Sequence, residues 1–126
     1  MLHHSILETL PRELQKEAVE SIKVMRFPPG QILFRAGEHC KGLPLMLSGA
    51  VKVQMTGVSG NSIVLYRMGA DDICTLSIGC LMTGYEYRAE AFVEEASEAA
   101  MVPRGLFDRL MDQSAAFRRM DERLED

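Results

Sequence analysis

The residues with the most chemical potential lie together between positions 71 and 91. This segment, DDICTLSIGCLMTGYEYRAEA, holds two cysteines, two tyrosines and one arginine, and it lacks the alternation of a strand. An arginine among hydroxyl groups can bind an anion, because its guanidinium supplies charge together with directed donors. The candidate ligand-binding residues are Thr75, Leu76, Ser77, Tyr85, Tyr87, Arg88 and Ala89.

The same segment also has a purely structural interpretation. Leu76, Ile78, Leu81 and Met82 make it mostly apolar, and such a segment can fill the end of a barrel without any ligand. The apolar majority favours this plug over a binding site. The identity of any effector stays open at this point.

The three cysteines indicate reduced thiols. Cys40, Cys74 and Cys80 form an odd set with no CxxC pair, which suits neither a disulfide framework nor a zinc or iron–sulfur site. We therefore expect buried, inert thiols and no metal site, although the sequence does not settle whether one of them senses redox state.

Motifs of catalysis are missing from the sequence. It contains no nucleophile elbow, HExxH or P-loop. Its three histidines fall in turn or terminal positions, with His3 and His4 in an end expected to fray. The prediction is a protein that is not an enzyme.

Composition and charge favour a soluble binding domain. The chain has 126 residues, 47% of them hydrophobic and 25% charged, which fits one domain with a core of its own. Its net charge of −4 argues against nucleic-acid binding by this part of the protein. No apolar run reaches the ~20 residues that a membrane helix needs. We expect a cytoplasmic protein without a membrane partner.

The segment 71–91 is positioned by helices and strands, which the spacing of apolar residues along the chain predicts. Leu10, Leu14, Ala18 and Ile22 recur every fourth residue and predict a helix over about 10–23. Short alternating stretches such as AVKVQMT, separated by glycine-rich turns, predict a β sandwich or barrel over 24–103. The fold class is thus mainly β with flanking helices.

Helices are predicted again over 104–126. Phe117, Met120 and Leu124 form a narrow apolar seam with charged residues around it. This seam has two interpretations: it packs on its own domain, or it begins a partner-helix interface. The second predicts a homodimer through these three residues.

Most of the chain resembles a known family. FPPGQILFRAGE, followed by LPLMLSGAVKVQMTGVSGNSIVLYRMGADDIC, resembles the sensor domain of Crp/Fnr-type bacterial transcription regulators, which belong to the cyclic-nucleotide-binding jelly rolls. VPRGLFDRL is similar to the stretch that leads into their long dimerisation helix. The likeness covers about residues 20–120. It implies an antiparallel jelly-roll barrel, or double-stranded β-helix, over 24–103 and a sensory and dimerisation role. It also implies DNA contacts through a C-terminal helix-turn-helix domain that is absent from this chain.

The resemblance also implies a role for residues 71–91. In cyclic-nucleotide-binding relatives a Gly-Glu pair opens the phosphate cassette, and an arginine followed by a small hydroxyl residue closes it. Here those positions fall on Thr75 and Leu76, and on Tyr87 and Arg88. The carboxylate is gone and the arginine is one place late. A slip of one residue points a side chain to the opposite face, so Arg88 faces the pocket only if the alignment is displaced by one residue here. Cyclic AMP and cyclic GMP are therefore disfavoured as ligands.

An alternative function is a free-standing cyclic-nucleotide-binding module that regulates a partner protein. The reading frame separates the two, because a helix-turn-helix downstream favours the regulator and a stop codon at 127 favours the module.

Overall fold

The computed structural model describes residues 4–124, with side chains for residues 4–119. Along the chain its elements are α1 (Ser5–Glu8), α2 (Arg12–Ser21), β1 (Lys23–Phe27), β2 (Ile32–Phe34), β3 (Gly42–Thr56), β4 (Ser62–Met68), α3 (Thr75–Thr83), β5 (Glu90–Pro103), α4 (Arg104–Gln113) and α5 (Ala115–Leu124). No helix within the described residues is long and apolar enough to cross a membrane.

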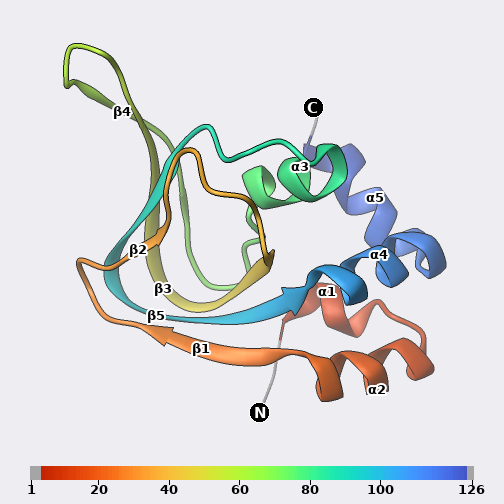
Figure 1. Ribbon diagram of the computed structural model, residues 1–126. Helices are drawn as coiled ribbons and strands as arrows, with labels where there is room; N and C mark the ends of the chain where they lie inside the picture. The colour runs from red at the N-terminus through yellow and green to blue at the C-terminus, as the bar shows by residue number, and fades with distance from the viewer. Residues whose placement is uncertain (1–3, 125–126) are drawn as a thin grey trace.

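The strands form one antiparallel sheet that curves around the core. Its order is β1-β5-β3-β4, and β2 pairs with β5 beside this path. β3 and β5 bend together into a roll, with α3 at one end of it and the other helices beside it (Figure 1). The prediction of a mainly antiparallel β fold of the jelly-roll type with flanking helices is confirmed.

The two central strands are longer than the sequence suggests. β3 runs without a break through Gly49, and β5 runs without a break through Ala96. Register shifts in the β3–β5 pairing bend these strands without ending them. Gly49 lies at such a shift with φ of 96°, and an added Cβ would lie 2.5 Å from Ser97 Cα. Only glycine fits this crossing.

The N-terminal helix is shorter than predicted. α2 spans Arg12–Ser21 because Pro11 precedes it in an extended conformation and Ile22 is extended again. Leu14 and Ala18 form its buried face. The residues that follow form β1, an edge strand with only Phe27 buried, so its burial pattern shows no alternation for the sequence to reveal.

His4 is buried, contrary to the expectation of a frayed end. Its Nδ1 accepts a hydrogen bond from the Ile6 amide at 3.2 Å, and its Nε2 lies 3.2 Å from the Asp72 carbonyl oxygen. An accepting Nδ1 leaves Nε2 as the donor to that carbonyl. The Asp71 carboxylate accepts bonds from the Ser5 amide and hydroxyl at 2.7 and 2.6 Å. His4 and Ser5 are thus bound to the start of the 71–91 segment.

The C-terminal helices pack on their own domain at the point where a dimer seam was predicted. Phe117 is fully buried, and its ring meets Phe107 edge to face at 5.8 Å. The assignment of Phe117 to an open seam is therefore corrected. Met120 and Leu124 lie outside the described side chains, so a homodimer through the rest of α5 stays a prediction.

Candidate functional site

The 71–91 segment contains a short helix that covers one end of the roll. α3 ends at Gly84, which takes the left-handed conformation (φ 78°) and donates its amide to the Cys80 carbonyl at 2.8 Å. Ile78 and Leu81 are buried, as the plug interpretation expects, whereas Met82 is exposed. The helix is therefore part of the core on one face and open on the other.

The seven candidate residues divide between these two faces. Thr75, Leu76, Tyr85 and Arg88 line a cavity of about 380 Å³ together with Cys80 and Glu86. We call this the cassette cavity. The other three candidates, Ser77, Tyr87 and Ala89, do not line it and are buried.

Arg88 lines the cassette cavity, one of the two directions that the sequence left open for it. The side chain is exposed, and its guanidinium makes no hydrogen bond or ion pair with the described residues. Such an unpaired guanidinium is available to an anion that enters the cavity. Leu76 contributes an apolar side chain at the position that the resemblance assigns to the glutamate of the Gly-Glu pair.

Tyr87 fills the interior beside α3. Its ring stacks on Phe34 with centroids 3.8 Å apart and planes 8° apart. Its hydroxyl lies 2.6 Å from Ser77 Oγ and 3.0 Å from Cys40 Sγ. Burial raises the pKa of Tyr87 above its ordinary value, and the hydrogen bond with Cys40 raises it further. The phenol is therefore neutral.

Ser77 extends this network to a second thiol. Its Oγ lies 3.1 Å from Cys74 Sγ. Because one proton lies between the two oxygens of Ser77 and Tyr87, two chains are open: Ser77 donates to Tyr87 and Tyr87 to Cys40, or Tyr87 donates to Ser77 and Ser77 to Cys74. Either chain joins α3 to the residues around it.

The three thiols lie in the interior of the domain. Cys40, Cys74 and Cys80 are free and buried. Burial raises the pKa of Cys74 and of Cys80, so both are held as neutral thiols. Among residues 4–124, no group of three or more histidine, cysteine or acidic side chains is placed to hold a metal ion.

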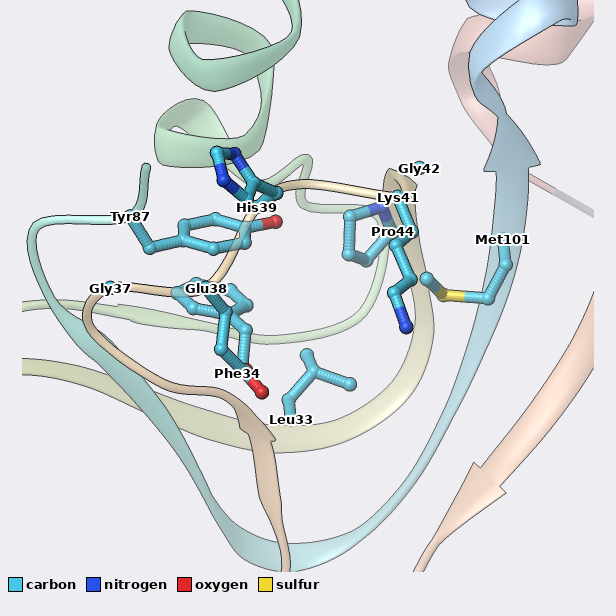
Figure 2. A pocket seen from close by; sticks show the side chains of 10 residues that line it. All are labelled: Leu33, Phe34, Gly37, Glu38, His39, Lys41, Gly42, Pro44, Tyr87 and Met101. Carbon is cyan, nitrogen blue, oxygen red and sulfur yellow. The ribbon is translucent and has the colours of Figure 1, made fainter. Parts of the chain in front are cut away.

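The turn between β2 and β3 lies against the end of the cassette. The Gly37 amide donates to the Tyr87 carbonyl at 2.9 Å, and the Tyr87 amide donates to the Glu38 carbonyl at 3.0 Å. His39 Nε2 lies 3.8 Å from Glu86 Oε1. A second cavity, of about 460 Å³, opens on this turn, and Tyr87 is part of its wall (Figure 2).

The sequence did not reveal this second cavity. Its lining includes Leu33, Lys41, Pro44 and Met101, which come from separate parts of the chain. RAGEHCKG reads only as a polar turn, and the cavity depends on the pairing of β3 with β5. A proline inside a long strand, at Pro44, was the one local signal of an unusual surface there.

Comparison with known proteins shows the family of this chain. The profile described as "Cyclic nucleotide-binding domain" matches residues 24–114. The chain belongs to the cyclic nucleotide-binding domain family. This is a regulatory domain family, and the match covers the whole roll with α3 and α4.

Solved structures of the same fold come from several kinds of regulator. A protein assigned to the Crp/Fnr family of transcriptional regulators from Eubacterium rectale is 22% identical, with a TM-score of 0.83 over 95% of this chain and 56% of its own. The sensor domain of the transcriptional regulator DNR from Pseudomonas aeruginosa is 19% identical, with a TM-score of 0.81 over 97% of this chain and 81% of its own.

A protein kinase regulatory subunit also shares the fold. The regulatory subunit of a cAMP-independent protein kinase A from Trypanosoma cruzi, bound to guanosine, is 15% identical, with a TM-score of 0.81 over 96% of this chain and 42% of its own. This chain thus spans about half the length of several of its structural neighbours. No curated protein matches it at a significant level.

Proposed function

We propose that this chain is the sensory domain of a Crp/Fnr-type transcription regulator that does not use the standard cyclic-nucleotide contacts. Family membership and neighbours among Crp/Fnr regulators support the first part. The second part rests on the cassette. The role is regulatory rather than catalytic, and the expected location is the cytoplasm of a bacterium.

The observation that carries the proposal is the placement of Tyr87. In this family's cassette the resemblance assigns that position to the arginine that neutralises the cyclic phosphate. Here the residue is a neutral, buried phenol that stacks on Phe34 and bonds Ser77 and Cys40. Its hydroxyl is engaged by Ser77 and Cys40 in the interior, so it does not contact a phosphate in the cassette cavity.

Leu76 removes the second standard contact. A ribose hydroxyl that enters the cavity beside an apolar side chain loses a hydrogen-bond partner, which costs on the order of 1–3 kcal/mol. This cost corresponds to roughly fivefold to 150-fold in affinity. Arg88 still offers a cation within the cassette cavity. The effector that fits is therefore an anion that needs no carboxylate to accept from a ribose.

The rest of the regulator is proposed from the family. We expect a homodimer, with DNA bound through a C-terminal helix-turn-helix domain outside this chain. A free-standing module that acts on a partner protein is the second candidate, and the fold shared with kinase regulatory subunits favours it.

The reading frame beyond codon 126 tests the choice between these functions. The regulator predicts an open frame that encodes the rest of the long helix and a helix-turn-helix. A stop codon at 127, or a downstream domain with no DNA-binding motif, contradicts the regulator and leaves the module.

A further inference from the structure

The cavity on the β2–β3 turn is separate from the cassette cavity. It has a volume of about 460 Å³, within the range of small-molecule sites. It shares no lining residue with the cassette cavity. Figure 2 shows it between the stacked rings of Phe34 and Tyr87 on one side and Pro44 and Met101 on the other.

Most of the wall of this cavity is apolar, and all of its apolar residues except Tyr87 come from strands. Leu33, Phe34, Pro44, Tyr87 and Met101 form it. Pro44 and Met101 face each other across the β3–β5 pairing, and Phe34, Pro44 and Tyr87 are buried. An apolar wall on paired strands is preformed, so a ligand gains contact area at little cost in ordering.

A single ammonium group projects into this apolar space. Figure 2 shows Lys41 Nζ extending between Leu33 and Met101. It makes no hydrogen bond or ion pair with the residues the structure describes. Lys41 is therefore the cation that a ligand can use.

The other charged groups on the rim already have partners. Glu38 Oε1 accepts the Arg35 amide at 2.7 Å, and the His39 ring faces the Glu86 carboxylate at 3.8 Å. The Glu38 carboxylate lies on the same turn as Lys41, so the rim carries little net charge. A ligand with one negative charge is therefore repelled less by Glu38 than a doubly ionised phosphate is, and it still pairs with Lys41.

We propose that this cavity binds a small monocarboxylate with a compact apolar body. The carboxylate lies on Lys41 Nζ, where it forms a charge-assisted hydrogen bond. The apolar body packs against Leu33, Pro44, Met101 and the Phe34–Tyr87 pair, where it leaves water. The site has the composition of small-molecule pockets in general, with an apolar lining and one polar anchor.

The site has a physical connection to α3. Tyr87 forms part of the cavity wall, and its hydroxyl is 2.6 Å from Ser77 Oγ on that helix. A ligand that contacts the Tyr87 ring therefore acts on a residue that is hydrogen-bonded to α3. This consequence rests on the proposed sensory role, whereas the binding itself does not.

Titration of the chain with benzoate, followed by amide chemical shifts, tests the proposal. We expect shifts concentrated at Gly37, Lys41, Gly42 and Met101. Benzyl alcohol, the neutral match, should bind at least tenfold more weakly. Lys41→Gln should lower benzoate affinity at least tenfold without changing that for benzyl alcohol. Lys16→Gln removes an exposed positive charge from α2 and should change neither affinity.

Three outcomes overturn the proposal. These are no shifts at millimolar benzoate, equal affinities for benzoate and benzyl alcohol, or shifts centred on Thr75, Leu76 and Arg88. The last would place the acid in the cassette cavity. Cyclic AMP titrated in a separate sample reports on the cassette alone, so a failure here is distinct from a failure of the proposed function.

Discussion

The hydroxyl oxygen of Tyr87 lies 2.6 Å from Ser77 Oγ, and this contact joins the residues before β5 to the first turn of α3. Both side chains are buried. Tyr87 also forms part of the wall of the cavity on the β2–β3 turn. One hydrogen bond thus connects α3 to a residue of the second cavity's wall, and the first prediction concerns its removal.

Tyr87→Phe should lower the free energy of unfolding by about 1–2 kcal/mol. The ring and its stacking on Phe34 remain, while Cys40 and Ser77 each lose a buried partner. Urea denaturation of the variant and the wild type measures the change. Tyr85→Phe is the matched control, because Tyr85 is 76% exposed, and it should leave stability unchanged. Equal effects of the two variants would contradict the network.

Gly49→Ala should cost more than Gly60→Ala. Both glycines have positive φ, 96° and 88°, so both variants pay a strain of roughly 1 kcal/mol. Only at Gly49 does the new Cβ also clash, 2.5 Å from Ser97 Cα, whereas nothing lies within 4 Å of the site at Gly60. The clash should add about 1–3 kcal/mol. Thermal unfolding of both variants gives the difference, and similar melting temperatures would show that β3 and β5 do not cross so closely.

The domain should lose stability as pH rises above about 9. Burial raises the pKa values of Cys74, Tyr66 and Tyr87 in the folded state, so the unfolded state releases these protons first. Stability is then complete below the unfolded pKa values, near 8.5 for a thiol and 10 for a phenol, and falls as pH rises through them. Urea midpoints at successive pH values measure the slope. Tyr66→Phe should reduce it, and a flat profile between neutral pH and pH 10 would refute this account.

Asp71→Ala should release the N-terminus more than Asp71→Asn. The carboxylate of Asp71 accepts bonds from the Ser5 amide and hydroxyl, and its φ of 71° is one that asparagine tolerates and alanine does not. Alanine should cost about 1–2 kcal/mol and asparagine less. Hydrogen exchange of the Ile6 and Leu7 amides reports the release. Unchanged protection in the alanine variant would mean that His4 alone holds this end.

The sequence predicts the parts of this fold that repeat a local pattern. The fourfold spacing of Leu14 and Ala18 identifies α2, and alternation identifies the part of β3 after Gly49, whereas the part before it is an unbroken buried run. β1 has no such pattern because most of it is exposed at an edge. The burial of His4 could not be predicted, since its partner Asp72 is distant in sequence.

The candidate site was predicted as one set and is divided by helical geometry. Successive residues of a helix point about 100° apart, so Leu76 and Ser77 lie on different faces of α3. Leu76 lines the cassette cavity and Ser77 is buried against Tyr87. A prediction of a helix over 75–83 would have placed Leu76 and Ser77 on different faces. The direction of Arg88 depended on the local path of the chain before β5, which no residue pattern specifies.

A thermal-shift titration with cyclic AMP tests the central claim most directly. A ligand held at ~100 times its dissociation constant stabilises a domain by about 2.7 kcal/mol, a readily measured change in melting temperature. With Tyr87 at the arginine position and Leu76 at the glutamate position, we predict no shift at low-micromolar cyclic AMP. A clear upward shift at that concentration, abolished by Arg88→Gln, would show that Arg88 alone provides the standard recognition and would contradict the account.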